Sequence, residues 1–445
     1  MQASKSARAR KARLPQGVSA LAQIGEEIER RWAGRCHRFN FFHHIATDCL
    51  REAAFHQKFD ADEIIAWVNR AENLPPQLDP RSRFGQPPLT VWRNERFVLD
   101  LYFWVDTETS IHDHAFSGAF TNLVGHSLNC SYHFERAARH GEGLFTGSLA
   151  FKHADYVMPG DVCPIVGGSR FIHRVWHLDC PTITLVARTT QRQANLRQYT
   201  YFPEGLAVQY RASPPVEFQR RREFMGYHFR SRHPRRIALC EATLRHARGW
   251  ELFLLLRDLV TFYLNGTDDA AELEGVLARL PARNRLWIET GLSVMRAAHP
   301  LKSVYWHRLQ QTEHRLLISL LSTYTERQPV IEWLARHGYA DDWRALLTRW
   351  LSEMDADKAL RLRLGSAGAE IIEHLLGGLS DAEALCELRR TYVISDAEAE
   401  LLMQGFRRFR ELPFLQSFLD SRTRADAVRT RAKGARRAAR VAASL

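Results

Sequence analysis

The chain has 445 residues, of which 45% are hydrophobic and 25% charged, and its formal net charge is +12. This composition is that of an ordinary globular protein with room for two or three domains. It excludes a membrane-spanning protein, because the most apolar run, residues 250–264, contains Arg257 and Asp258 and is too short to cross a bilayer.

Residues 1–15 are predicted to form a disordered basic arm, and residues 16–88 a helical region that ends in a linker. Within this region apolar side chains recur at helical spacing, as Leu21, Ile24 and Ile28 do. The arm has no apolar stretch after it, so we do not expect a secretory signal. The linker, L-P-P-Q-L-D-P-R-S-R-F-G-Q-P-P, is rich in proline and marks a change in the kind of structure.

Residues 89–215 are predicted to form a β-barrel. The hydrophobic period changes to two in R-F-V-L-D-L-Y-F-W-V, at residues 96–105, and similar runs follow as far as residue 188. Gly, Pro and Asp separate these runs at short intervals. This pattern is typical of antiparallel sandwiches and barrels, of which the jelly roll is one form.

Residues 216–420 are predicted to form an all-α domain, since apolar residues recur there at spacings of three and four. The segments S-D-A-E at 380–383 and 395–398 are typical of helix N-termini. No fixed repeat period is evident, so the pattern indicates a bundle or an irregular solenoid.

Positive charge is concentrated in a basic tail, residues 421–445, where eight Lys and Arg residues accompany a single acid, Asp426. A second cluster, R-R-R, lies at residues 220–222. Basic patches attract nucleic acid, acidic proteins or anionic lipid. Because no nucleic-acid-binding fold or aromatic platform accompanies them, we interpret them as solvated and do not predict a nucleic-acid or membrane partner. The seven scattered cysteines form no Cys-x-x-Cys pair, which favours reduced thiols and a cytoplasmic location.

Two histidines lie two residues apart in T-S-I-H-D-H-A-F-S-G-A-F, residues 109–120. On a strand, residues i and i+2 share a face, so His112 and His114 would direct both imidazoles to one point while Asp113 faces away. Two converging imidazoles make half of a transition-metal site. Such a pair alone is more typical of hydrogen-bonded core or surface histidines, so the interpretation depends on further ligands.

A third histidine, His173, follows a P-G-D turn and is expected on the next strand. The sequence reads S-I-H-D-H at residues 110–114, I-H-R-V at 172–175 and V-W-R-N at 91–94. With these motifs it resembles the cysteine dioxygenase type of the cupin superfamily, over roughly residues 60–205. The resemblance and the zones above together imply an α+β multidomain protein: a cupin-type β-barrel (jelly roll) with N-terminal helices and a C-terminal all-α domain.

The resemblance also implies a mononuclear Fe(II) site on His112, His114 and His173, with molecular oxygen as co-substrate. Arg93 aligns with the arginine that binds the substrate carboxylate in that family, a role that suits a bidentate guanidinium. Other cupins carry a metal-binding Glu four or five residues after the H-x-H motif. Here Gly and Ala stand at those positions, 118 and 119, which fits the branch whose iron is held by imidazoles alone.

The strand after the third ligand departs from the family. Its members carry Ser, His and Tyr at alternate positions where this chain has Thr184, Val186 and Arg188. These three residues are candidates for lining the pocket. His126 is a further candidate, but a structural or surface-exposed role is favoured for it. His177 is expected to be structural, because on a strand it would lie about 13 Å from the metal ligand four residues before it.

Two functions from different classes are compatible with these residues. The first is an Fe(II) oxygenase acting on a small carboxylate-bearing substrate, a thiol or an amino-acid derivative. The second is a non-catalytic cupin that senses a ligand and binds a protein partner through its helical domain. The retained ligands and Arg93 favour the first, whereas the lost His and Tyr and the long helical extension favour the second.

Overall fold

The computed structural model divides into two compact units, Met1–Pro300 and Leu301–Leu445. The described residues are 15–78, 84–105, 107–140, 143–190, 196–209, 215–247, 249–264, 269–285, 287–289, 308–339, 342–412 and 414–419. Nearly all of the predicted basic arm and the whole basic tail therefore lie outside the described residues. No helix among the described residues is both long and apolar enough to cross a membrane.

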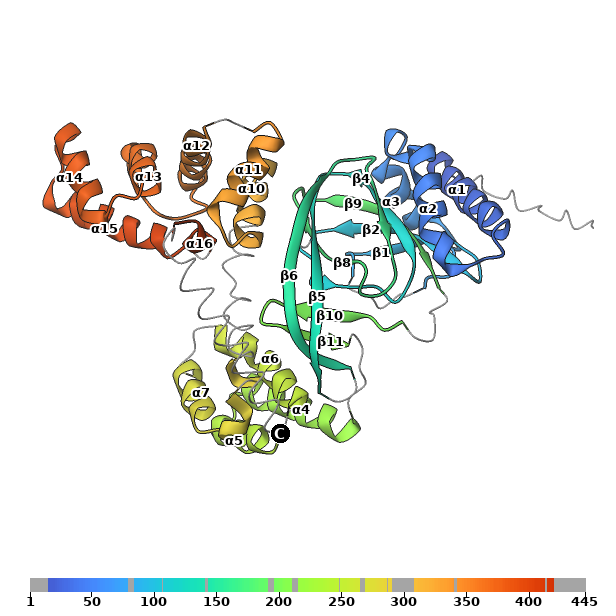
Figure 1. Ribbon diagram of the computed structural model, residues 1–445, viewed down its shortest axis with the longest axis horizontal. Helices are drawn as coiled ribbons and strands as arrows, with labels where there is room; N and C mark the ends of the chain where they lie inside the picture. The colour runs from blue at the N-terminus through green and yellow to red at the C-terminus, as the bar shows by residue number, and fades with distance from the viewer. Residues whose placement is uncertain are drawn as a thin grey trace, which may run out of the picture. The chain divides into compact units, whose positions relative to one another are not determined.

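Helices at the N-terminus cover one face of a β-sheet (Figure 1). They are α1 (Gln16–Ala33), α2 (Phe39–Ala53) and α3 (Ala61–Arg70), with a short 3-10 turn, η1 (Phe55–Gln57), between the last two. The apolar stripe expected from the helical spacing is present, because Leu21, Ile28 and Phe42 are fully buried against the sheet. The predicted N-terminal helices are confirmed.

The β region forms two antiparallel sheets. The strands are β1 (Pro88–Arg93), β2 (Phe97–Trp104), β3 (Ile111–His112), β4 (Gly118–Val124), β5 (Ser127–Arg139), β6 (Leu144–Val157), β7 (Val162–Ile165), β8 (Ile172–His177), β9 (Thr182–Thr189), β10 (Tyr199–Phe202) and β11 (Leu206–Gln209). One sheet has the order β1-β2-β9-β4-β7, and the other closes into a ring, β10-β11-β6-β5-β8-β3. Phe120 and Val186 of the first sheet share a hydrophobic core with Val175 of the second, so the sheets pack face to face. This is the predicted jelly-roll architecture.

Strict alternation along β9 separates the two environments of the first sheet. Leu185 and Ala187 are fully buried against the N-terminal helices. Thr184, Val186 and Arg188 face the opposite way, into the space between the sheets. One side of the sheet therefore serves packing and the other is available for a site.

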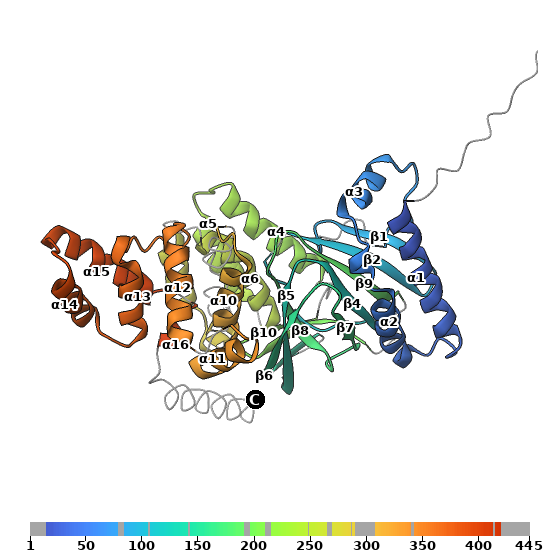
Figure 2. The same ribbon diagram turned by 90° about the horizontal axis from the view of Figure 1, so that it is seen from above.

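A second set of helices packs on the other sheet and belongs to the same compact unit (Figure 2). They are α4 (Val216–Arg230), α5 (Arg236–His246), α6 (Trp250–Leu264) and α7 (Asp269–Ala278), followed by η2 (Ala282–Asn284). Leu144 of β6 and Leu206 of β11 share their hydrophobic core, and Phe253 of α6 contacts Phe202 of β10 with ring centroids 5.2 Å apart. The boundary between the compact units therefore falls inside the 216–420 stretch, and helices α4 to α7 are part of the β-rich unit.

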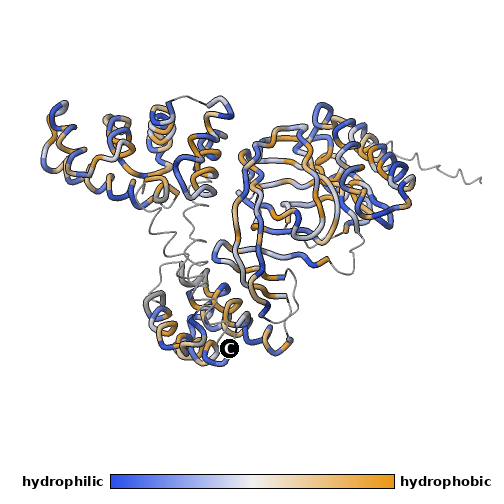
Figure 3. Tube along the Cα trace, in the orientation of Figure 1, coloured by the Kyte–Doolittle hydropathy of each residue, from blue (hydrophilic) through white to orange (hydrophobic). Residues whose placement is uncertain are grey.

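The second unit is helical throughout its described residues. Its elements are α10 (Thr312–Thr323), α11 (Arg327–Arg336), α12 (Trp343–Ala356), η3 (Gly365–Ala367), α13 (Gly368–Leu376), α14 (Asp381–Thr391), α15 (Asp396–Arg410) and α16 (Gln416–Leu419). Hydrophobic and hydrophilic residues alternate along these helices (Figure 3). Ser380 and Ser395 form the predicted capping boxes with Glu383 and Glu398. The predicted architecture, a jelly-roll β-barrel with helices before and after it in the sequence, is confirmed.

Candidate metal centre

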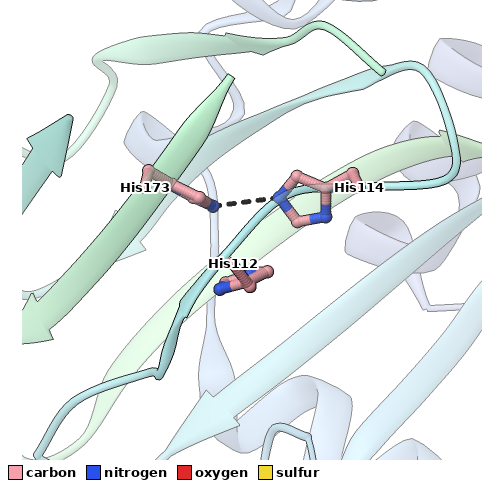
Figure 4. Close-up of side chains that lie close together, drawn as sticks. All are labelled: His112, His114 and His173. Atoms are coloured by element: carbon pink, nitrogen blue, oxygen red, sulfur yellow. Dashed lines mark hydrogen bonds between the residues drawn. The ribbon is translucent and has the colours of Figure 1, made fainter. Parts of the chain in front are cut away.

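The three histidines of the predicted site lie together between the sheets (Figure 4). His112 ends β3 and pairs across the sheet with His173 of β8, and His114 follows in the turn after β3. Their exposed fractions are 3%, 4% and 5% for His112, His173 and His114. Two motifs that are far apart in the sequence are thus joined by a single strand pairing.

Asp113 fixes the turn that separates the first two histidines. Its carboxylate accepts hydrogen bonds from the Tyr199 backbone N–H at 2.5 Å and from Tyr201 Oη at 2.7 Å, both in β10. Its own N–H donates to the Tyr199 carbonyl oxygen at 3.1 Å. The carboxylate therefore faces away from the imidazoles, as the two-residue period predicts, and ties the turn to the neighbouring strand.

The imidazoles are close enough to share one ion. One ring nitrogen from each lies within 4.8 Å of the others, and the Nε2 atoms of His114 and His173 are 2.9 Å apart. Two nitrogen ligands at about 2.1 Å from a metal and at right angles to one another are about 3.0 Å apart. The observed separation fits adjacent ligands of one metal ion.

Hydrogen bonds orient two of the rings. His112 Nδ1 donates to the Ser110 carbonyl oxygen at 2.7 Å, and His173 Nδ1 donates to Asn129 Oδ1 at 2.9 Å. In each ring the proton is thereby placed on Nδ1, and the Nε2 lone pair is left for a ligand bond. His112 Nε2 and His114 Nδ1 are buried without a partner among the described residues.

Burial keeps these imidazoles neutral. It lowers the pKa of His112 to about 4. Burial first, and then the neighbouring imidazoles, lower the pKa of His114 and of His173 well below the usual value. Neutral imidazole is the form that binds a metal, so the donor set and its protonation fit a metal ion, and the unpartnered Nε2 of His112 is free to bind it.

The backbone explains why the set has no carboxylate. Gly118 pairs with Arg188 on the cavity side of the sheet, but a Cβ at this position would lie 2.2 Å from the Ala187 carbonyl oxygen. Ala119 is fully buried on the other side, in the core with the N-terminal helices. Neither position can direct a glutamate toward the histidines without a shift of the backbone.

The histidines border a cavity of about 370 Å³ between the sheets. Its aromatic walls include Phe84, Tyr102, Trp104, Phe116 and Phe120. The Phe84 ring lies 5.8 Å from the His112 ring and 5.0 Å from the Trp104 ring, measured between centroids. Such a concave, largely apolar space with a few polar groups is typical of a small-molecule site.

Two charged residues line this cavity among the described residues, and they neutralise each other. Arg188 Nη2 and Nε each lie 2.8 Å from Asp100 Oδ2, and Thr90 Oγ1 donates to the other carboxylate oxygen at 2.7 Å. The side chain of Asp100 is 3% exposed. Burial raises the pKa of Tyr102, which lies beside this pair and stays protonated.

Of the four candidate pocket residues, three line the cavity and one, His126, does not. Thr184, Val186 and Arg188 line the cavity, and Thr184 Oγ1 accepts a hydrogen bond from Trp104 Nε1 at 3.0 Å. His126 does not border the cavity: its ring bonds Asp179 at 2.8 Å and stacks on Tyr156, which supports the structural alternative.

The position of Arg93 does not support the carboxylate-binding role expected for it. Arg93 is absent from the cavity wall, and its Nη1 donates to the Pro76 carbonyl oxygen at 3.2 Å. Strand pairing puts Arg93 opposite Val98 and Val98 opposite Arg188, so Arg93 is two strands away from the arginine that does line the cavity. The motif match pointed to an arginine on β1, whereas the arginine that lines the cavity, Arg188, is on β9.

Sequence reasoning missed three residues of this site. Asn129 orients His173, Asp100 pairs with Arg188, and His177, expected to be structural, lines the same cavity. Asp100, Tyr102 and Trp104 alternate along β2 and so share one face of the strand, which could have indicated that Asp100 lines the cavity. Nothing in the sequence alone indicates the pairing of Asn129 with His173.

No protein-family model matches this sequence, and the search of curated proteins gives no match. Among solved structures, the chain is similar to the DMSP lyase DddQ from Ruegeria pomeroyi DSS-3, with 16% identity and a TM-score of 0.21 over 32% of this chain and 68% of that one. It is similar to hydroquinone 1,2-dioxygenase PnpCD with 16% identity and a TM-score of 0.18, over 24% and 64% of the two chains. The chain is also similar to a structure described under DMSP lyases RdDddP and RnDddQII. The sequence identity is 15% and the TM-score 0.24, over 42% of this chain and 100% of that one. The jelly-roll fold is defined by the strand order of the two sheets, and the candidate site by the three histidines.

Proposed function

We propose that this protein is a mononuclear non-haem Fe(II) oxygenase that acts on a small molecule with molecular oxygen as co-substrate. The observation that supports this most is the convergence of three buried, neutral imidazoles, without a carboxylate ligand, on a cavity between the sheets. Fe(II) held by such a set would supply a redox-active centre with coordination positions open to a substrate donor atom and to oxygen.

The residues of the chain hold and shield this centre. The Ser110 carbonyl and Asn129 fix the rings of His112 and His173, so that their Nε2 atoms are presented together. Aromatic side chains line the cavity and give it an apolar wall against which a small substrate can pack. The chain therefore provides a preorganised site in which a small substrate would be held beside the metal.

The placement of Arg93 and Arg188 changes the substrate that we propose. The carboxylate was expected because of Arg93, which lies outside the cavity, and Arg188 is already paired with Asp100. The proposed substrate is therefore a small molecule with one anionic donor atom, such as a thiolate, for the metal. It does not need a carboxylate.

A specific contact keeps the ligand-sensing alternative open. Asp113, between two of the histidines, is bonded to β10, and Phe202 of β10 packs on helix α6. A ligand that moved the turn after β3 would therefore act on a strand that touches the helices. Under this alternative the protein binds metal and ligand, and the helical region binds a protein partner.

Oxygen consumption separates the two functions. Purified protein is loaded with Fe(II) under argon, and an oxygen electrode records the response to a panel of thiols, amino acids and phenols. If the protein is an oxygenase, at least one compound should cause oxygen uptake, and His114→Ala should abolish that uptake. Tight binding of panel compounds to the iron-loaded protein without any uptake would contradict the oxygenase and support the sensing module.

A further inference from the structure

His177, the last residue of β8, is a buried histidine whose ring finds no hydrogen-bond partner among the residues that the structure describes. It is 2% exposed, and neither ring nitrogen has a partner within the described part of the chain. Nearly all buried polar side-chain groups in proteins are hydrogen-bonded, so an exception of this kind indicates a missing partner. His177 lines the same cavity as the three clustered histidines.

Stacking holds this ring in place. The His177 ring lies parallel to the Trp104 ring, with centroids 4.3 Å apart and an angle of 16° between the planes. The backbone N–H of His177 donates to the Thr107 carbonyl oxygen at 2.9 Å. Trp104 is itself fixed by its hydrogen bond to Thr184. Packing thus presents the imidazole to the cavity, and no described residue uses its hydrogen-bonding capacity.

The ring is neutral, because burial lowers the pKa of His177 to about 3. A neutral imidazole has one N–H donor and one acceptor nitrogen, and it suits an uncharged partner such as an amide or a hydroxyl group. The charges of Asp100 and Arg188 cancel one another nearby, so the described wall of the cavity offers no free charge to an ionic group.

The cavity continues from the clustered histidines to His177. His173 and His177 lie on the same strand about 13 Å apart, and Phe84 contacts both His112 and Trp104. The aromatic rings of Phe84 and Trp104 along this path fit a flat ligand better than a branched aliphatic one.

We propose that His177 and Trp104 form a second anchor, which binds an uncharged hydrogen-bonding group on a planar, aromatic substrate whose other end carries the metal-binding donor. The metal end of this arrangement rests on the proposed function, whereas the anchor at His177 does not need the metal. The substrate class is therefore an aromatic molecule with an anionic donor at one end and an amide, carbonyl or hydroxyl group at the other.

A pair of probes tests the anchor. Full-length protein loaded with Zn(II) is titrated calorimetrically under argon with 4-acetamidothiophenol and with 4-isopropylthiophenol, which share a thiolate and a ring but differ in the polar end. We expect roughly tenfold or greater preference for the acetamide, because the apolar probe leaves the imidazole unpaired. In His177→Phe, which keeps an aromatic ring beside Trp104, the preference should fall below about threefold with Zn(II) content unchanged.

The metal-free protein gives a second, independent readout. Replacing an unpartnered buried imidazole by a phenyl ring should leave the melting temperature unchanged or raise it. The matched control is His314→Phe, since His314 is also buried, at 1% exposure, but bonds Glu353 at 2.9 Å, and this variant should melt lower.

Three results would overturn the anchor: an unchanged probe preference in His177→Phe, a loss of melting temperature like that of His314→Phe, or no binding of either probe to protein that holds Zn(II). Failure of the oxygenase proposal would be seen separately, as an absence of oxygen uptake, because neither readout here uses iron or oxygen.

Discussion

Replacing Asn129 by Ala removes the acceptor that orients His173 and leaves the three imidazoles themselves in place. His173 Nδ1 donates to Asn129 Oδ1 at 2.9 Å, and both side chains are buried, with 4% and 3% exposed. Without this bond the ring can rotate or carry its proton on Nε2, the atom that faces the other histidines. We therefore expect weaker metal binding with the ligand set intact.

The magnitude follows from the kind of contact that is lost. Loss of a hydrogen bond that orients a metal-binding histidine reduces metal affinity by roughly 10- to 100-fold, which corresponds to about 1.4–2.8 kcal/mol. The unpaired Nδ1–H should also lower the free energy of unfolding of the metal-free protein by about 1–3 kcal/mol. Competition titration of Zn(II) against a chromophoric chelator measures the first quantity, and chemical unfolding the second.

Asn122→Ala is the matched control. Asn122 is fully buried, and its Nδ2 donates to Ser127 Oγ at 3.0 Å and to the Gly125 carbonyl oxygen at 3.2 Å, outside the cavity wall. This variant should lose stability but keep its affinity for Zn(II). Equal Zn(II) affinities in Asn129→Ala and the unmodified protein would contradict the orienting role of Asn129. So would an equal loss of Zn(II) affinity in Asn122→Ala.

The remaining predictions concern the cavity wall. Gly118→Glu should lower the melting temperature without adding a ligand, because its Cβ would lie 2.2 Å from the Ala187 carbonyl oxygen; tighter metal binding at unchanged melting temperature would contradict this. Arg188→Met should lower the free energy of unfolding by about 3–5 kcal/mol, because the buried carboxylate of Asp100 loses its cation. A double variant that also carries Asp100→Asn should recover much of this loss. Equal losses in the single and double variants would be inconsistent with the ion pair. Burial lowers the pKa of His177 from 6.5 to about 3 in the folded state. The unfolded chain therefore binds the proton more readily, and stability falls by about 1.4 kcal/mol per pH unit as the pH drops below the unfolded value. His177→Phe should make this fall between pH 6.5 and 4 shallower in unfolding titrations of metal-free protein, and an identical slope would show that His177 is not buried in its neutral form.

Local chemistry determined what could be predicted from the sequence. Strand geometry alone predicts that His112 and His114 face one side and Asp113 the other, and the structure shows this arrangement. The capping boxes that begin at Ser380 and Ser395 likewise depend on residues only three apart, and both are present. Family motifs then supplied His173, and with it the three-histidine cluster.

Pairing between distant strands determined what could not be predicted. In β1 the register shifts between Thr90 and Trp92, and Arg93 ends beside Pro76, so its motif match did not place it in the cavity. The pairing of β2 with β9 puts Asp100 within reach of Arg188, whose positions in the sequence give no sign of an ion pair.

His177 lies outside the three-histidine cluster, as its spacing from His173 predicts, but it lines the cavity, which the spacing did not indicate. The space beside β8 extends past His173 along the strand, so a residue too far away to bind the metal still lines the site. The shape of a cavity depends on both sheets together, and a single strand pattern cannot define it.

Metal analysis of four single variants tests the central claim most directly. His112→Ala, His114→Ala, His173→Ala and His177→Ala are purified alongside the unmodified protein, loaded with Fe(II) under argon, desalted and measured by mass spectrometry. We expect about one metal ion per chain in the unmodified protein and in His177→Ala, and loss of most of it in each of the other three variants. Unchanged iron in His173→Ala would contradict a metal centre built on these three histidines.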